Sequence, residues 1–341
     1  GYVVPDGFSE QPGIRVLEGD REILTTDCDG LREAVVESGR HSTGLVGFRL
    51  DDLNIPRLRE KQNIAIHDRK TGLLVYRRVP DASTVKKRVL RLETQLVPYR
   101  KIDRLLDPRF HYAIRQVERF GHETAMQAFH LNGIASSYIS GRLLLRNYEE
   151  FLEKGFEVVT LINDPYQEMA ERLFLFKRFA RMPQALFGER DRMLLAPAVR
   201  HFQNVDLASA KSIDRALKAA DEQVLRILTA PLTRQLVTTH PDQPVTRQSV
   251  APAMDALSRF AVLGLKAHPE TFAEPLAEYL RVPISDLPVP SIDVVTSALA
   301  DLLRQLVRSE RLLEFDLILY HFVREAIMHH HEVRPAAEIR A

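Results

Sequence analysis

The hydrophobic pattern of the first 78 or so residues alternates with a period of two. Apolar residues recur at every second position in GIRVLEGDREILTTD (13–27), STGLVGFRLDDL (42–53) and QNIAIHDRKTGLLVYRR (62–78). This period is typical of half-buried strands, and the polar, glycine-containing stretches 18–20 and 69–72 are predicted to be hairpin turns. We therefore expect residues 1–79 to form a small antiparallel β-sandwich domain, with one or two helical turns at 31–37.

Two roles are open for this β domain. It can serve as a folding or interface module, or it can bind carbohydrate. The chain has no tryptophan, so stacking on a sugar ring would fall to the aromatic residues Tyr2, Phe8, Phe48 and Tyr76.

After Pro80 the apolar period becomes mostly helical. A strand at 110–114 is followed by a loop and a helix at 123–131, and a strand at 156–162 by a helix at 166–179. Strand, loop and helix in this order predict a parallel α/β sheet with ligands at the carboxyl ends of its strands. We also expect strands at 88–94 and 257–265, and helices at 270–280, 294–308 and 312–328. Residues 84–330 should form this α/β domain, with a parallel sheet flanked by helices, and 331–341 a C-terminal tail.

Composition narrows the classes of function. The 341 residues carry a formal net charge of +1, so we expect no nucleic-acid partner. A single cysteine, Cys28, excludes a disulfide framework and a cysteine-based zinc cluster. No apolar run reaches the roughly 18 residues of a membrane span, and the first residues lack signal-peptide features, so we expect a cytoplasmic protein. The histidines 329–331 are expected past the last helix, as an exposed tail rather than a metal site.

Four strings in the second half resemble one family. They are SSYISGRL (136–143), FEVVTLINDPYQEMAERLFLF (156–176), FAVLGL (260–265) and LLEFDLILY (312–320). In this order they resemble the carbohydrate sulfotransferases, whose fold is P-loop-like α/β, over residues 105–328. GLVGFRL (44–50) is similar to a string in small β modules of bacterial surface-polysaccharide enzymes. The resemblance implies a sulfotransferase-like group transferase acting on a bacterial surface polysaccharide, such as a capsule, or on another glycan.

The resemblance also implies a site. The donor would be adenosine 3′-phosphate 5′-phosphosulfate, without a metal, and the acceptor a saccharide. The best match to the family's phosphosulfate loop is 115–124, and His122 and Glu123 are the candidates for a general base. The candidates for donor binding are Arg119, Gly121, Thr124, Ser140, Arg142 and Asn163. Plain structural roles remain open beside these, since Gly121 or Thr124 can cap the helix after the loop and Ser140 can cap another.

The chain departs from the family at the second phosphate site. Where the family has arginine, arginine and serine, this sequence has Asn163, Glu168 and Glu171. A carboxylate about 4 Å from a phosphate dianion repels it by several kcal/mol. Asp164 and Pro165 between them also suit a helix start, as cap and first-turn residue.

Two hypotheses follow from this departure. The first is a transferase with a degenerate donor-phosphate site, which we rank first because the acceptor-side strings survive. The second is a non-catalytic protein of the same fold that acts as a binding or assembly component in polysaccharide biosynthesis, with polysaccharide-assembly proteins as partners. In the second case we expect the cleft to be closed by its own side chains, with Arg119 or Arg142 paired to Glu168 or Glu171.

Overall fold

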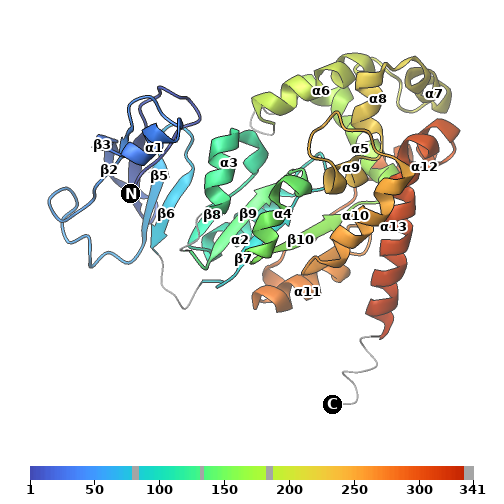
Figure 1. The fold of residues 1–341 in the computed structure, drawn as a ribbon. Helices are drawn as coiled ribbons and strands as arrows, with labels where there is room; N and C mark the ends of the chain where they lie inside the picture. Colours follow the sequence, from blue (N-terminus) through green and yellow to red (C-terminus); the bar gives the residue numbers. More distant parts are fainter. Residues whose placement is uncertain (79–83, 131–133, 182–186, 334–341) are drawn as a thin grey trace. The chain divides into compact units, whose positions relative to one another are not determined.

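The computed structural model describes residues 1–78, 84–130, 134–181 and 187–333 (Figure 1). The chain divides into two structural units. The first consists of Gly1–Val89 and Asp103–Ser140, and the second of Leu90–Ile102 and Gly141–Ala341. The predicted domain junction near 79–83 and residues 334–341 of the predicted tail lie outside the described residues.

The first unit begins with an antiparallel sheet in the strand order β2-β1-β5-β6. Its strands are β1 (Gly13–Glu18), β2 (Arg21–Asp27), β5 (Ile64–Asp68) and β6 (Leu74–Arg78). Alternate residues of β1 and β5, including Ile14, Val16, Ile64 and Ile66, form the buried core of this sheet. A short ladder of β3 (Gly30–Leu31) and β4 (Leu45–Gly47) accompanies it, with α1 (Glu33–Glu37) between them. The predicted antiparallel sheet is confirmed, and so is the first hairpin, which turns at Gly19 with a φ of +60°.

A five-stranded parallel sheet has the order β11-β10-β7-β9-β8, as predicted for an α/β fold. The strands are β7 (Arg88–Leu92), β8 (Tyr112–Ile114), β9 (Ser137–Gly141), β10 (Phe156–Ile162) and β11 (Val262–Leu265). β10 is apolar and buried at nearly every position, which is the pattern of a strand covered on both faces. Two helices follow the first two strands, α2 (Arg100–Leu106) and α3 (His122–Phe129).

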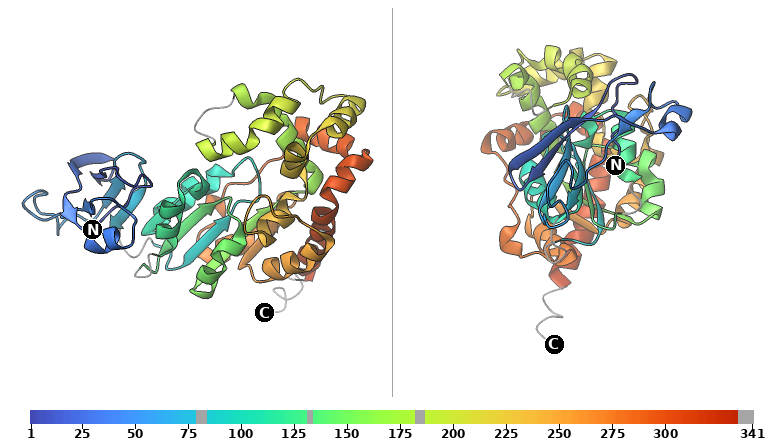
Figure 2. Two further views of the ribbon diagram at one scale, coloured as in Figure 1. Left: turned by 45° about the horizontal axis from the view of Figure 1, so that its top comes forward. Right: turned by 90° about the vertical axis from the view of Figure 1, so that its left-hand side faces the viewer.

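Helices make up most of the second unit (Figure 2). In chain order they are α4 (Glu149–Glu153), α5 (Pro165–Arg178), α6 (Glu189–Phe202), α7 (Ala210–Ala219), α8 (Glu222–Leu228), α9 (Pro231–Val237), α10 (Val250–Ser258), α11 (Glu270–Leu280), α12 (Val294–Arg304) and α13 (Val307–Val333). Helices α4, α11 and α13 contact β10 or β11. The apolar faces of α5 to α8, α12 and α13 meet in one core, to which α5 contributes Met169, Leu173 and Phe176. This core holds α5, and with it the loop that follows β10, in a fixed place.

Three sequence predictions need correction. The expected strand 257–265 is in fact the end of α10 followed by a strand of four residues from Val262. α10 buries Ala253, Ala256 and Leu257, which lie three and four residues apart, so the period there is helical. The closing helices break between Arg304 and Val307, earlier than expected. The histidines 329–331 lie within α13, not beyond it.

Candidate functional site

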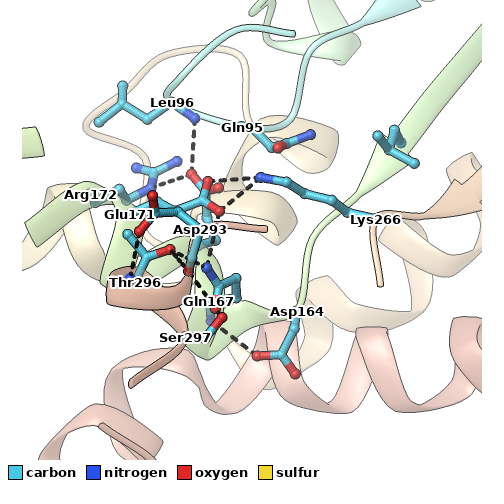
Figure 3. Close-up of polar contacts among 12 residues, drawn as sticks. Gln95, Leu96, Asp164, Gln167, Glu171, Arg172, Lys266, Asp293, Thr296 and Ser297 are labelled. Atoms are coloured by element: carbon cyan, nitrogen blue, oxygen red, sulfur yellow. Dashed lines mark hydrogen bonds and ion pairs between the residues drawn. The ribbon is translucent and has the colours of Figure 1, made fainter. Parts of the chain in front are cut away.

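The carboxyl ends of three strands supply the loops of the candidate site in the second unit. These loops follow β7, β10 and β11, and Figure 3 shows the side chains that they and α5 place together. The loop after β10 turns directly into α5, because the Asp164 carboxylate accepts the Gln167 N–H at 3.0 Å and Pro165 occupies the first turn. The predicted structural role of these two residues is confirmed. α5 then presents Glu168, Glu171 and Arg172 from one helical face.

The Glu168 carboxylate lies buried between a cation and a peptide group. Its Oε1 accepts a hydrogen bond from Arg172 Nε at 2.8 Å and another from the Leu96 N–H at 2.9 Å. Arg172 also donates to the carbonyl of Ile227 at 3.0 Å. Burial raises the pKa of Glu168, and the Arg172 charge opposes that rise. The charge of Arg172 is therefore already paired with Glu168.

Glu171 forms a second buried ion pair of the site, with Lys266, the first residue after β11. Lys266 Nζ donates to both carboxylate oxygens, at 2.8 and 3.0 Å, and both side chains are about nine-tenths buried. Gln167 donates to the same carboxylate at 3.2 Å and to the Thr296 hydroxyl at 2.7 Å. This network connects β11, α5 and the start of α12 (Figure 3).

The loop between β7 and α2 turns its peptide N–H groups toward carboxylates. Buried Glu93 accepts from the N–H groups of Gln95 at 3.2 Å and Tyr99 at 2.7 Å, and from Arg91 at 3.0 Å. The Leu96 N–H goes to Glu168 instead. A loop with several converging N–H groups after a parallel strand is a common place for a bound anion. Here two side-chain carboxylates occupy these donors.

The cavity enclosed at this edge is about 20 Å³, which is room for about one water molecule. Its lining includes Asn163, Glu168 and Asp316. Among the described residues, both amide atoms of Asn163 and Oε2 of Glu168 have no hydrogen-bond partner. Asp316 accepts two N–H groups and a hydroxyl from Leu232 and Thr233, and burial raises its pKa. A nucleotide phosphate does not fit in this cavity.

A second, more open pocket of about 290 Å³ lies beside the start of α5. Arg304 lines it and donates to Asp164 at 3.0 Å and to Asp301 at 2.7 Å. Arg324 and Tyr320 also line this pocket and add a second guanidinium group and a hydroxyl. Burial raises the pKa of Tyr320 to about 12. The two aspartates balance the two arginines, so this pocket too offers little net positive charge to a phosphate.

The loop predicted to bind phosphosulfate lies in the first unit. The N–H groups of Gly121 and Thr124, at the start of α3, donate to the Asp6 carboxylate at 2.9 and 3.2 Å. Gly121 is the N-cap of α3, as one alternative predicted. Arg119 is exposed and has no side-chain partner among the described residues. His122 and Glu123 open α3, but their side chains are not among those that the structure describes.

Two further residues predicted to bind the donor, Ser140 and Arg142, have contacts that differ from the prediction. Ser140 lies inside β9, so it caps no helix, and its buried hydroxyl has no partner among the described residues. Arg142 pairs with Asp191 and lies 5.8 Å from the ring centre of Phe187. The expected pairing of Arg119 or Arg142 with Glu168 or Glu171 is wrong, since Arg172 and Lys266 hold these two carboxylates instead.

Three residues of the site were not predicted from the sequence: Glu93, Leu96 and Lys266. Glu168 and Arg172 are four residues apart on one helix, a spacing that indicates an ion pair. For Lys266 no local signal exists, because it is 95 residues from Glu171.

Comparisons with known proteins add no family to this description. No family model matches the chain, and no curated protein or solved structure matches it either. Within the described residues, no helix is long and apolar enough to cross a membrane. The same part of the chain holds no cluster of three or more histidine, cysteine, aspartate or glutamate side chains that could bind a metal ion. The class that fold and site define is thus an α/β protein with buried carboxylates at the carboxyl ends of its parallel strands.

Proposed function

We propose that the protein is a non-catalytic member of the sulfotransferase-like fold that serves as a binding or assembly component in polysaccharide biosynthesis. In this proposal it binds saccharide, works with polysaccharide-assembly proteins in the cytoplasm and does not use the sulfuryl donor. The observation that carries the non-catalytic part is the carboxylate of Glu168, which takes both the Leu96 N–H and the Arg172 guanidinium. The saccharide and the assembly partners rest on the family resemblance of the sequence.

Electrostatics favours this proposal over donor binding. A donor phosphate at this edge would lie near Glu168 and Glu171, and two unit charges 4 Å apart repel by about 4 kcal/mol at an effective dielectric of 20. To use Lys266, the phosphate would also have to break a buried ion pair, and leaving a buried charge unpaired costs about 3–5 kcal/mol. Binding of a nucleotide in the micromolar range yields only about 8 kcal/mol in total. These costs therefore consume most of the available binding energy.

A transferase with a degenerate donor site is the second candidate. It is favoured by the presence of two cations, Arg172 and Lys266, at the carboxyl edge of the strands. Donor binding would then require Glu168 and Glu171 to release them, with adenosine 3′-phosphate 5′-phosphosulfate as the donor. His122 or Glu123 would be the base toward the acceptor hydroxyl, a role that needs a pKa near neutrality.

Calorimetric titration with adenosine 3′,5′-bisphosphate, the donor's product, tests the proposal. We expect the wild-type chain to bind it more weakly than about 1 mM. The double variant Glu168→Ala, Glu171→Ala frees both cations and enlarges the cavity, so it should gain measurable binding. The control is Glu150→Ala, Glu153→Ala on α4, which changes the net charge equally at exposed positions. Micromolar binding by the wild type would overturn the proposal, and equal behaviour of the two double variants would refute its electrostatic cause.

A further inference from the structure

A cavity of about 920 Å³ lies within the first unit, a size typical of small-molecule sites. Three of the four aromatic residues that the sequence offers for sugar stacking line it, together with side chains from β8 and α3: Tyr2, Phe48, Tyr76, Tyr112 and Gln127. Hydrogen bonds hold the walls together. Gln127 Nε2 donates to the Val4 carbonyl at 3.2 Å, and Arg77 of β6 donates to the Asp107 carboxylate at 2.9 Å.

The charged residues around this cavity balance one another. Three carboxylates and three cationic side chains line it, together with the imidazole of His130: Asp6, Glu10, Asp68, Arg40, Lys70 and Arg78. Lys70 pairs with Glu10 at 2.7 Å, and Arg78 donates to two backbone carbonyls. Asp68 accepts the N–H and the hydroxyl of Thr71. Because these charges are compensated, the cavity favours a neutral ligand over an anion or a cation.

The groups left for a ligand are aromatic faces and neutral polar atoms. The Tyr76 side chain is 41% exposed, although it lies beside the buried sheet core, so part of its ring is available for stacking. Tyr112 is 6% exposed, and no hydrogen bond of its hydroxyl is described. Burial raises the pKa of this hydroxyl, so that it stays a neutral donor and acceptor. The hydroxyl is not among the enclosed polar atoms that lack a partner, so it is open to a hydrogen bond with a ligand or water.

We propose that this cavity binds a neutral saccharide, whose apolar ring face stacks on Tyr76 and whose hydroxyl groups pair with Tyr112 and Gln127. A pyranose ring has apolar C–H faces and a rim of hydroxyls, which matches an aromatic wall beside uncharged polar groups. This inference deepens the proposed function and rests on it for the choice of saccharide among neutral ligands. It assigns saccharide binding to the first unit, whereas the carboxylate-filled edge belongs to the second.

The test uses the full chain and three neutral disaccharides, cellobiose, maltose and N,N′-diacetylchitobiose, with binding followed by saturation-transfer NMR and calorimetry. We expect at least one to bind. Tyr76→Ala should weaken that binding about tenfold, the scale of one aromatic contact. Tyr112→Phe removes only a hydroxyl and should weaken it about three- to tenfold. Phe322→Ala is the control, because Phe322 is an exposed aromatic residue of α13 in the other unit.

Three results would overturn the inference. Binding that Tyr76→Ala and Tyr112→Phe leave unchanged would locate the saccharide elsewhere, while the proposed function would stand. Binding of the neutral nucleoside uridine, with none of the disaccharides bound at about 10 mM, would assign the cavity to another ligand class. Absence of all binding at that concentration would refute the saccharide site, whereas the nucleotide titration above still decides the non-catalytic part of the proposed function.

Discussion

Replacing Lys266 by methionine tests whether the ion pair at the carboxyl edge is as buried as it appears in the structure. Methionine keeps the length and apolar stem of lysine but removes its charge. Glu171 then retains only the Gln167 amide, at 3.2 Å, among the side-chain donors described above. A carboxylate left buried with one neutral donor is strongly destabilised.

The expected size follows from distance and burial. The Nζ and Oε atoms are 2.8 and 3.0 Å apart, with 10% and 12% of the two side chains exposed. At 2.8 Å and an effective dielectric of 20, the gross attraction is about 6 kcal/mol, and desolvation of both ions offsets much of it. We therefore expect Lys266→Met to lower the free energy of unfolding by about 3–5 kcal/mol. Adding Glu171→Gln should recover about 2 kcal/mol or more, because no charge is then left unpaired.

The assay is guanidinium denaturation followed by far-UV circular dichroism, on the wild type, both single variants and the double variant. The double-mutant cycle gives the coupling free energy between the two side chains. Lys154→Met is the matched control, because Lys154 pairs with Glu150 on the exposed face of α4, 3.8 Å away, and should change stability by less than about 1 kcal/mol. A coupling below about 0.5 kcal/mol between Lys266 and Glu171 would refute the argument that this pair is a dry, fixed part of the site.

Two further predictions concern single positions in each unit. Burial, followed by the charge of nearby Asp68, raises the pKa of the Cys28 thiol from 9.0 to about 11, so a thiol reagent at pH 8 should react about 100-fold more slowly with the folded chain than with the unfolded chain. Because the unfolded thiol ionises first, stability should also fall as pH rises from about 9 to 11, and a Cys28→Ala variant should lose that part of the dependence. In the second unit, a Cβ added at Gly264 would lie 2.4 Å from Cβ and 2.6 Å from Cα of Phe272, so Gly264→Ala should force α11 away from β11 and lower the melting temperature. A melting temperature within about 1 °C of the wild type would show that β11 and α11 are not in such close contact.

Helices and strands with a clear hydrophobic period were predictable from the sequence. Their first and last residues were harder to predict, because partners distant in sequence often set them. The hairpin around Gly19, the buried strand β10 and helix α11 all show their pattern within one short stretch. The apolar run before β11 does not, because α10 and β11 both bury apolar side chains and only pairing with β10 fixes where the strand begins. Helices α6 to α9 were not predicted. α6 contains Pro197, and α8 and α9 have only seven residues each, too few to display a helical period.

The site was predictable in its chemistry but not in its contacts. The sequence shows carboxylates where the carbohydrate sulfotransferases that it resembles have phosphate-binding groups, and it therefore predicts repulsion of a phosphate. The structure adds that carboxylates also take the donors a phosphate would need, since Glu168 accepts the Leu96 N–H from 72 residues away. Asp6 does the same at the start of α3, from a position more than 100 residues before it. Such long-range partners leave no trace in local sequence, and through them carboxylates of the chain itself occupy these N–H groups. These contacts also stabilise the fold. A substitution of Glu168 or Glu171 that leaves Arg172 or Lys266 unpaired should therefore lower the free energy of unfolding, even where it gains anion binding.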